Sequence, residues 1–298
     1  MSVDGTDITY HVPGLKDTVR LFVISDTHLY QSDSREEPFR QYSKRMAGAY
    51  NETRHFQTGE PTTPLEQLKV SLGIARDFGA DAVFHIGDAI SFPSELGVEL
   101  VVSSLDETGI PWYYISGNHD WHYEGMEGTE NDLRAEWSEK RLSPLYRGYD
   151  MLGYSVEVGG VKIILINDST NAMLPEQLSF LRRELKGREP KLLFMHIPMY
   201  APARHPGGYT IGNPLWGWDC DEDWNYEQRE RWPKEGHAQT DYDFYDTALK
   251  AGSEGTLLGV VCGHVHRQGF DMLGELPQFT VRDNASGGYC RLTLIPAQ

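Results

Sequence analysis

Polar side chains of one chemical type follow five separate apolar segments of this chain. They are aspartate, asparagine and histidine side chains, at Asp26, His28, Asp88, Asn118, His119, Asp120, His196, His264 and His266. Imidazole combined with carboxylate suits zinc, iron or manganese, and the sequence lacks the paired cysteines that a structural zinc site uses. The pattern therefore predicts a transition-metal centre.

The spacing within these clusters suits a pair of metal ions. Asp-x-His at residues 26–28 and His-x-His at residues 264–266 place alternate side chains on one side of an extended segment. A glycine precedes Asp88, Asn118 and His264, which allows sharp turns and a close approach of the backbone to bound ions. In two-metal hydrolases the ions lie about 3.5–4 Å apart and share a bridging ligand. Each pair can therefore address one region of such a site.

Short apolar segments with many β-branched residues predict the strands that carry the clusters. These strands cover residues 19–25, 81–86, 111–116, 191–195 and 256–262. Helices are predicted over residues 64–78 and 93–108, between the first three strands. Alternating strands and helices indicate a sheet with crossover helices, in which ligands gather beyond the carboxyl ends of the strands. All five clusters are thus expected at one rim.

The second half of the chain has a different pattern. Residues 151–158 and 161–167 flank a Gly-Gly pair and predict a β-hairpin. The remaining predicted elements are helices over residues 175–186 and 241–251 and strands over residues 270–272, 278–282 and 288–294. We predict an α/β fold, a four-layer α/β/β/α sandwich of two mixed sheets with helices on both outer faces. No linker is evident, so residues 1–298 are expected to form one domain.

Two long stretches do not fit as regular elements. Residues 30–63 are polar, and their basic side chains are matched by acids. Residues 200–240 carry a cluster of acids and four tryptophans, at Trp216, Trp218, Trp224 and Trp232. Loops of this length are usually functional or disordered, and the aromatic content of the second favours an ordered lid. Whether its tryptophans pack a small core or contact the substrate stays open.

Charge and cysteine content restrict the partners. The net charge of −17 argues against capture of nucleic acid polymers, although bound cations would allow a small phosphate ester to bind. No secretory signal is visible, and no apolar run approaches the length of a membrane span. The three cysteines cannot all pair. A cytoplasmic protein is therefore expected, and the sequence leaves the oligomeric state open.

The order of the clusters resembles a known family. Asp-x-His, Gly-Asp, Gly-Asn-His-Asp, His and Gly-His-x-His, from Asp26 to His266, resemble the calcineurin-like metallophosphoesterase superfamily. The Gly-Asn-His-Asp form looks closest to the bacterial branch that includes class III cyclic-nucleotide phosphodiesterases. The tyrosine that purple acid phosphatases place shortly after Gly-Asp is missing, because Asp88 is followed by Ala-Ile-Ser. A coloured iron–phenolate centre is therefore not expected.

The resemblance implies a role for each residue of the clusters. The ligands implied for the first metal are Asp26, His28 and His266. Those implied for the second are Asn118, His196 and His264, with Asp88 bridging both ions. The ions would be divalent or mixed-valence Mn, Fe or Zn, and a hydroxide held by them would attack phosphorus. His119 would protonate the leaving oxygen or stabilise charge, and Asp120 would orient the His119 ring.

The ligand types leave several functions open. The leading interpretation is a hydrolase of a small-molecule phosphodiester or phosphomonoester, and the alternative enzyme is a pyrophosphatase acting on nucleotide- or lipid-linked diphosphates. A non-catalytic metal-binding interaction scaffold is a third class, but every ligand position and His119 are filled. His55 and His85 are interpreted as ordinary core or surface groups, and His205 and His237 have a somewhat stronger claim to a role in chemistry.

Overall fold

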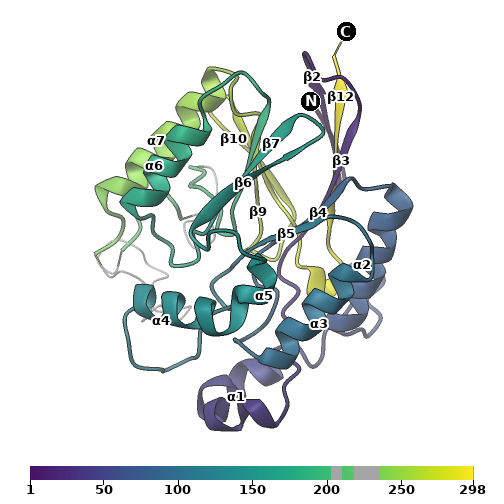
Figure 1. Cartoon of the computed structure of the whole chain (residues 1–298), viewed down its shortest axis with the longest axis vertical. Helices are drawn as coiled ribbons and strands as arrows, with labels where there is room; N and C mark the ends of the chain where they lie inside the picture. Colours follow the sequence, from purple (N-terminus) through teal and green to yellow (C-terminus); the bar gives the residue numbers. More distant parts are fainter. Residues whose placement is uncertain (203–209, 218–234, 298) are drawn as a thin grey trace.

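Two six-stranded mixed sheets form the centre of the molecule (Figure 1). The structure, a computed structural model, describes residues 1–202, 210–217 and 235–297. The first sheet has the order β1 (Ser2–Asp4), β2 (Asp7–Val12), β12 (Cys290–Pro296), β3 (Val19–Ile24), β4 (Ala82–Ile86) and β5 (Trp112–Ile115). The second has the order β10 (Gly269–Leu273), β11 (Leu276–Thr280), β9 (Gly259–Cys262), β8 (Lys191–Phe194), β7 (Val161–Ile166) and β6 (Gly153–Val158).

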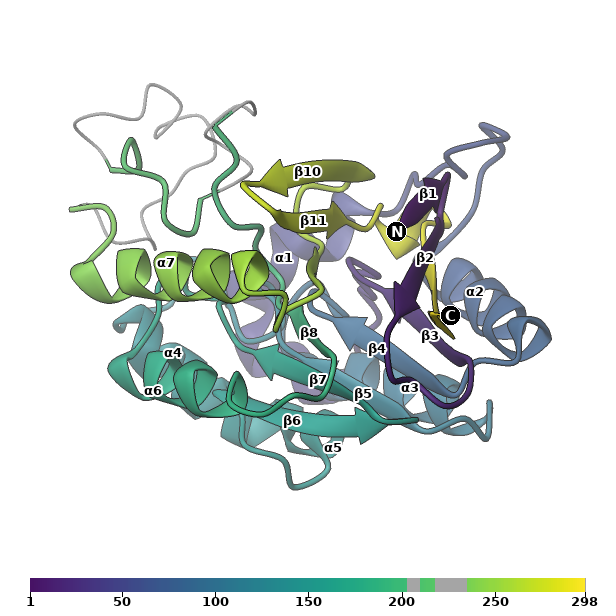
Figure 2. The same cartoon turned by 90° about the horizontal axis from the view of Figure 1, so that it is seen from above.

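Helices cover the outer faces of both sheets (Figure 2). α2 (Pro64–Phe78) and α3 (Glu95–Asp106) lie on the side of the first sheet, and α6 (Pro175–Glu184) and α7 (Gln239–Ser253) on that of the second. The predicted four-layer α/β/β/α sandwich is therefore confirmed. The other helical segments are η1 (Ser34–Phe39), α1 (Arg40–Ala49), α4 (Glu130–Trp137), η2 (Ser138–Leu142), α5 (Ser143–Tyr146) and η4 (Asn284–Ser286).

Alternate side chains of the second sheet enter two different cores. Leu165 and Phe194 lie in the core between the sheets, where the Phe194 ring meets that of Phe84 edge to face at 4.9 Å. Ile164 and Leu193 point the other way and pack in the core that also holds α6 and α7. Since a strand alternates its side chains between its two faces, burial on both faces explains why these strands are apolar throughout.

The helix α2 begins and ends where its sequence predicts. The Thr63 side chain accepts a hydrogen bond from the Glu66 N–H, and Pro64 occupies the first turn. The helix ends at Gly79, whose φ of 67° lies in the left-handed region that favours glycine. Such local signals do not depend on the rest of the fold, so they are readable from the sequence.

Residues 30–63, predicted to lack regular elements, contain η1 and α1. That prediction was wrong because α1 is mostly polar and buries only Ser43 and Met46 among its ten residues. The strand β2 was also missed, although Ile8, Tyr10 and Val12 are buried in alternation along it. It pairs in parallel with β12, from the other end of the chain.

The described ends of the 200–240 stretch pack on the second sheet. Met199 and Ile211 form a parallel bridge, and Trp216 is buried with only 2% of its surface exposed. For Trp216, packing is therefore the observed role. The other predictions for this stretch concern Trp218, Trp224, Trp232, His205 and the acidic cluster, and they fall outside the described residues.

The structure describes two of the three cysteines and the helices that could have crossed a membrane. Cys262 and Cys290 are buried free thiols, and Cys220 lies outside the described residues. Across the described ranges, every helix is too short or too polar to cross a bilayer.

Candidate metal centre

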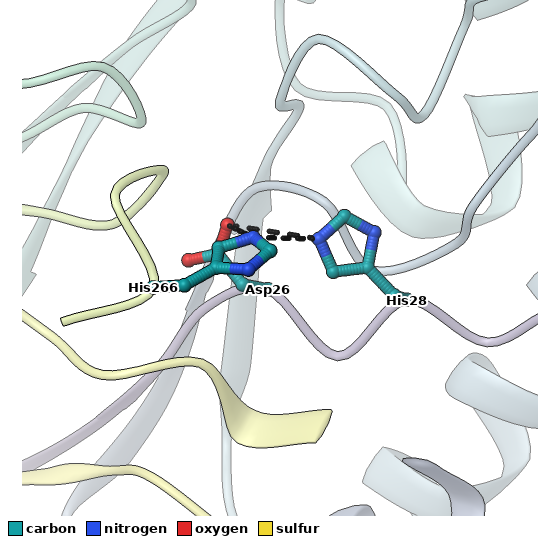
Figure 3. Close-up of side chains that lie close together, drawn as sticks. All are labelled: Asp26, His28 and His266. Carbon is teal, nitrogen blue, oxygen red and sulfur yellow. Dashed lines mark hydrogen bonds and ion pairs between the residues drawn. The ribbon is translucent and has the colours of Figure 1, made fainter. Parts of the chain in front are cut away.

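The loops that follow β3 and β9 form the first cluster of predicted ligands (Figure 3). The Nε2 atoms of His28 and His266 lie 3.1 Å apart. Asp26 Oδ1 lies 3.3 Å from His266 Nε2 and 3.9 Å from His28 Nε2. One ligand atom from each of the three residues thus lies within 4.8 Å of the others, which is the spacing that a shared cation requires.

The loops after β4, β8 and β9 form the second cluster. It contains Asp88, His196 and His264, again with ligand atoms within 4.8 Å of one another. Asp88 Oδ2 lies 3.2 Å from His196 Nε2 and 3.7 Å from His28 Nε2, which belongs to the first cluster. Asp88 therefore stands between the two groups, as a bridging ligand would.

The backbone of both clusters is held in an unusual conformation. Among the described residues, seven that are not glycine have a positive φ, and five of these are predicted ligands, namely Asp26, His28, Asp88, His264 and His266, with φ between 51° and 69°. Left-handed φ values are uncommon for such residues, and they persist only where the surrounding structure imposes them. Their concentration here marks the rim as a functional site.

The two sheets are tied together at this rim by hydrogen bonds of the ligands. The His264 N–H donates to Asp26 Oδ2 at 2.9 Å, and His196 Nδ1 lies 2.9 Å from the carbonyl oxygen of Ile86. That second contact makes Nδ1 the donor and leaves Nε2 directed at Asp88 and the cluster. Close packing also explains Gly263, because a Cβ there would lie 1.8 Å from Ser25 Oγ.

The donor set fits transition-metal ions. The buried Oδ1 of Asn118 has no hydrogen-bond partner among the described residues. Buried polar atoms without partners are rare and call for an explanation such as a bound ion. Imidazole nitrogen with carboxylate and amide oxygen matches the preferences of Mn, Fe and Zn. The residues present can therefore hold such ions.

Burial and charge set the protonation of the centre. Burial lowers the pKa of His264 to about 3 and that of His28 well below its ordinary value, so both rings are neutral and able to bind metal. Burial by itself would raise the pKa of Asp26 and Asp88. The neighbouring His266 and His196, respectively, outweigh it and hold both carboxyl groups in the ionised form.

His119 lies beside the predicted bridging carboxylate. Its N–H donates to Asp88 Oδ1 at 2.8 Å, and its ring meets the edge of the His28 ring at 5.1 Å between centroids. The side chain remains partly exposed, unlike the buried ligands Asp88 and His28. It is thus near the metal centre and accessible to a bound molecule.

Asp120, predicted to orient the His119 ring, accepts hydrogen bonds from the backbone and side chains around it. Its Oδ1 accepts from the Ile90 N–H at 3.0 Å, and its Oδ2 accepts from the Gly117 N–H and the Tyr114 hydroxyl, both at 2.8 Å. These bonds occupy both oxygens of a buried carboxylate. Asp120 therefore joins the loop after β4 to the loop after β5, and its orientation of the His119 ring stays a prediction.

The sequence analysis missed Asp168, which follows β7 and supports His196. Its two carboxylate oxygens accept from the N–H groups of His196 and Ile197, each at 2.9 Å, and burial raises its pKa to about 7. The available signal was the Asn-Asp-Ser run directly after an apolar strand, of the same type as the other clusters.

Asp168→Asn is expected to lower metal affinity about 10–100-fold, as is typical when a group that orients a ligand is lost. The amide provides one oxygen for two N–H donors, so the backbone at His196 must shift. A competition titration with a metal-binding dye would measure the loss. The control is Glu157→Gln on β6, which also removes one negative charge but at an exposed position, and it should bind metal as the wild type does. Equal metal affinities in all three proteins would contradict the supporting role of Asp168.

His85 is a structural histidine, as its interpretation predicts. It is fully buried, and its Nε2 lies 2.8 Å from Thr27 Oγ1, between the two ligands of the first loop. Thr27 also donates to Asn284 Oδ1 at 3.2 Å. Burial lowers the pKa of His85 from 6.5 to about 4. His85 therefore holds the Asp26 loop while uncharged.

This depressed pKa predicts a pH-dependent stability. Between pH 6.5 and 4 the unfolded chain binds a proton at His85 that the folded chain does not, so stability is lost as the pH falls. At pH 5 the contribution lost is about 2 kcal/mol relative to pH 8. The His85→Gln side chain can still form a hydrogen bond to Thr27. Between pH 8 and pH 5 its free energy of unfolding, measured with urea on chelator-treated protein, should therefore fall by about 2 kcal/mol less than that of the wild type. If the free energy of unfolding depends on pH in the same way in both proteins, His85 does not make this contribution.

Two of the isolated histidines outside the clusters, His55 and His237, have structural partners. His55 Nδ1 accepts from the N–H groups of Gln57 and Thr58 in a turn. His237 contacts the Thr210 carbonyl oxygen through Nε2, and its Nδ1 lies 3.4 Å from Asp241 at the start of α7. Both rings are thus engaged away from the metal clusters.

A second residue that sequence reasoning missed is Tyr50, at the end of α1. Its ring stacks on that of His28, with 4.2 Å between centroids and 12° between planes. No motif identifies it, because it lies in the polar stretch of residues 30–63. Three of the five basic residues of that stretch form ion pairs: Arg35 with Asp33, Glu95 and Glu99, Arg40 with Glu37, and Arg45 with Glu124.

Comparison with solved structures bears on the fold. A dimetal phosphatase from Danio rerio superposes with a TM-score of 0.56 at 13% identity, over 95% of this chain and 94% of that one. The purple acid phosphatase PPD1 from yellow lupin seeds gives a TM-score of 0.53 at 13% identity, over 93% of this chain and 45% of that one. At such identities the similarity shows the fold alone. A comparison with curated proteins found no match.

The molecule is a sandwich of two sheets, and imidazole and carboxylate side chains gather where strands of both sheets end. This arrangement defines a hydrolase of the metallophosphoesterase class. The chain belongs to the calcineurin-like phosphoesterase family, whose sequence model matches residues 19–268. This range includes every predicted site residue from Asp26 to His266. The resemblance drawn from the sequence is thereby confirmed, and the protein is an enzyme that hydrolyses phosphoesters.

Proposed function

We propose that this enzyme uses two metal ions to cleave a phosphodiester or phosphomonoester of a small molecule. The observation that carries the proposal is the pair of ligand clusters, joined by the 3.7 Å approach of Asp88 to His28. The net charge of −17 favours a compact substrate over a polyanion, since long-range repulsion would keep a polymer away.

We assign the ligands according to the two clusters. Asp26, His28 and His266 would hold one ion, and Asn118, His196 and His264 the other, with Asp88 shared. The Asn118 assignment is supported by its buried Oδ1, which lacks a partner among the described residues. Mn, Fe or Zn, in divalent or mixed-valence form, would suit these donors.

The chain's own residues would complete the chemistry. Bound ions in such a site supply Lewis-acid activation of the phosphoryl group and of the attacking water. His119, partly exposed beside Asp88, is placed to give a proton to the leaving oxygen. Asp120 would keep the Asp88 and Asn118 loops in register through its three hydrogen bonds.

Metal analysis coupled to a hydrolysis panel tests this proposal. The panel would contain p-nitrophenyl phosphate, bis-p-nitrophenyl phosphate and a nucleotide-linked diphosphate. We expect two ions per chain, hydrolysis of a monoester or diester, loss of activity with a chelator and recovery with Mn, Fe or Zn. Turnover of the diphosphate alone would identify a pyrophosphatase, and a metal-loaded protein that cleaves nothing would contradict the proposal.

A further inference from the structure

Tyr50 brings a phenol group to the edge of the metal centre. The helix α1 ends at this residue, and its ring lies flat against His28 at 4.2 Å between centroids. The His266 ring is 6.2 Å away, so Tyr50 flanks two of the three side chains in the first cluster. His119 approaches the same His28 ring by its edge, at 5.1 Å. Tyr50 and His119 therefore approach one ligand from different directions.

The hydroxyl of Tyr50 is not used within the described structure. None of the hydrogen bonds between described residues involves it. The buried hydroxyls of Tyr114, Tyr123, Tyr146 and Tyr154 have partners, whereas that of Tyr10, far from the clusters on β2, also lacks one. The side chain is only half-buried, so it can reach a bound molecule. A tyrosine hydroxyl at a partly buried site usually finds a partner, and here that partner can arrive with the ligand.

The position and the donor chemistry of this hydroxyl indicate which kind of partner it meets. The carboxylates of the two clusters, Asp26 and Asp88, interact electrostatically with the Tyr50 hydroxyl. Asp283 and the Arg45 guanidinium do so as well. A tyrosine phenol is protonated at neutral pH, so toward an anion it acts as a hydrogen-bond donor. A phosphoryl group held between the two metal sites carries such acceptor oxygens.

We propose that the Tyr50 hydroxyl donates a hydrogen bond to a non-bridging oxygen of the phosphate group bound at the metal centre. This inference rests on the proposed function and adds a substrate contact from residues 30–63. The ring and the hydroxyl have separate tasks: the ring packs against His28, and the hydroxyl binds the phosphoryl group. His119 would then serve the leaving oxygen.

Tyr50→Phe separates these tasks because it keeps the ring and removes only the hydroxyl. Inorganic phosphate is the probe, since it offers non-bridging oxygens and has no leaving group. Titration calorimetry on the metal-loaded protein should show phosphate affinity about 10–100-fold weaker than in the wild type, as expected for a lost bond to a charged group. Metal affinity should not change. Tyr42→Phe, on the same helix with its ring near Tyr123, should match the wild type in both measurements.

Two results would overturn the inference. Unchanged phosphate affinity in Tyr50→Phe would mean that the hydroxyl meets no phosphoryl oxygen. A loss of metal affinity that parallels the loss of phosphate affinity would make Tyr50 a residue that positions His28. Failure of the proposed function is a separate observation, because wild-type protein would then cleave none of the esters in the panel, while phosphate binding to the two proteins could still be compared.

Discussion

Asp88→Asn is expected to abolish metal binding and hydrolysis together. The amide can keep its oxygen toward the His119 N–H, where Asp88 Oδ1 now accepts at 2.8 Å. Its NH₂ group would then face His196 Nε2 and His28 Nε2, which lie 3.2 Å and 3.7 Å from Asp88 Oδ2. An NH₂ group cannot ligate a cation, so the shared ligand of both clusters is lost.

The expected effect of this substitution is large. Metal ions contribute several kcal/mol to stabilisation of the transition state, so kcat/KM should fall about 10³-fold or more. Metal content should fall from two ions per chain, as measured by inductively coupled plasma mass spectrometry. The control is Asp77→Asn on α2, which removes the same negative charge at an exposed position and should keep both metals and full turnover. An Asp88→Asn protein that behaves in the same way would refute the bridging assignment.

His119→Ala should leave both metals bound and still cost about 10²–10⁴-fold in kcat, the range typical of general acid catalysis. The His119 ring is partly exposed and contributes no atom to either ligand cluster, whereas its N–H, which contacts Asp88, survives the substitution. Metal stoichiometry and turnover are thus expected to separate, in contrast to Asp88→Asn.

The leaving group identifies the kind of catalysis that His119 performs. A nitrophenolate needs little protonation, so the loss in His119→Ala should shrink for p-nitrophenyl phosphate and be largest for an alkyl phosphate. The exposed His11 on β2 provides the control, since His11→Ala should change neither rate. Equal losses with good and poor leaving groups would show that His119 stabilises charge on the phosphoryl group instead of donating a proton.

The identity of the centre is determined largely by the sequence. Apolar strands followed at once by Asp-x-His, Gly-Asp, Gly-Asn-His-Asp, His and Gly-His-x-His are local features, and strand ends in such a fold converge without any knowledge of side-chain contacts. The helix α2 is readable for the same reason, since Thr63 and Gly79 act within a turn of its ends. Predictions of this kind succeed where each signal lies within a few residues.

Tertiary structure alone decided how the centre is supported. Asp120 bonds the backbone of two loops, Asp168 orients His196 from a neighbouring strand, and Tyr50 reaches His28 from a helix that is mostly polar in sequence. Each role depends on the direction of a side chain toward residues far away in the chain. No pattern in the sequence encodes those directions, because they follow from how the two sheets and the segment of residues 30–63 pack against one another.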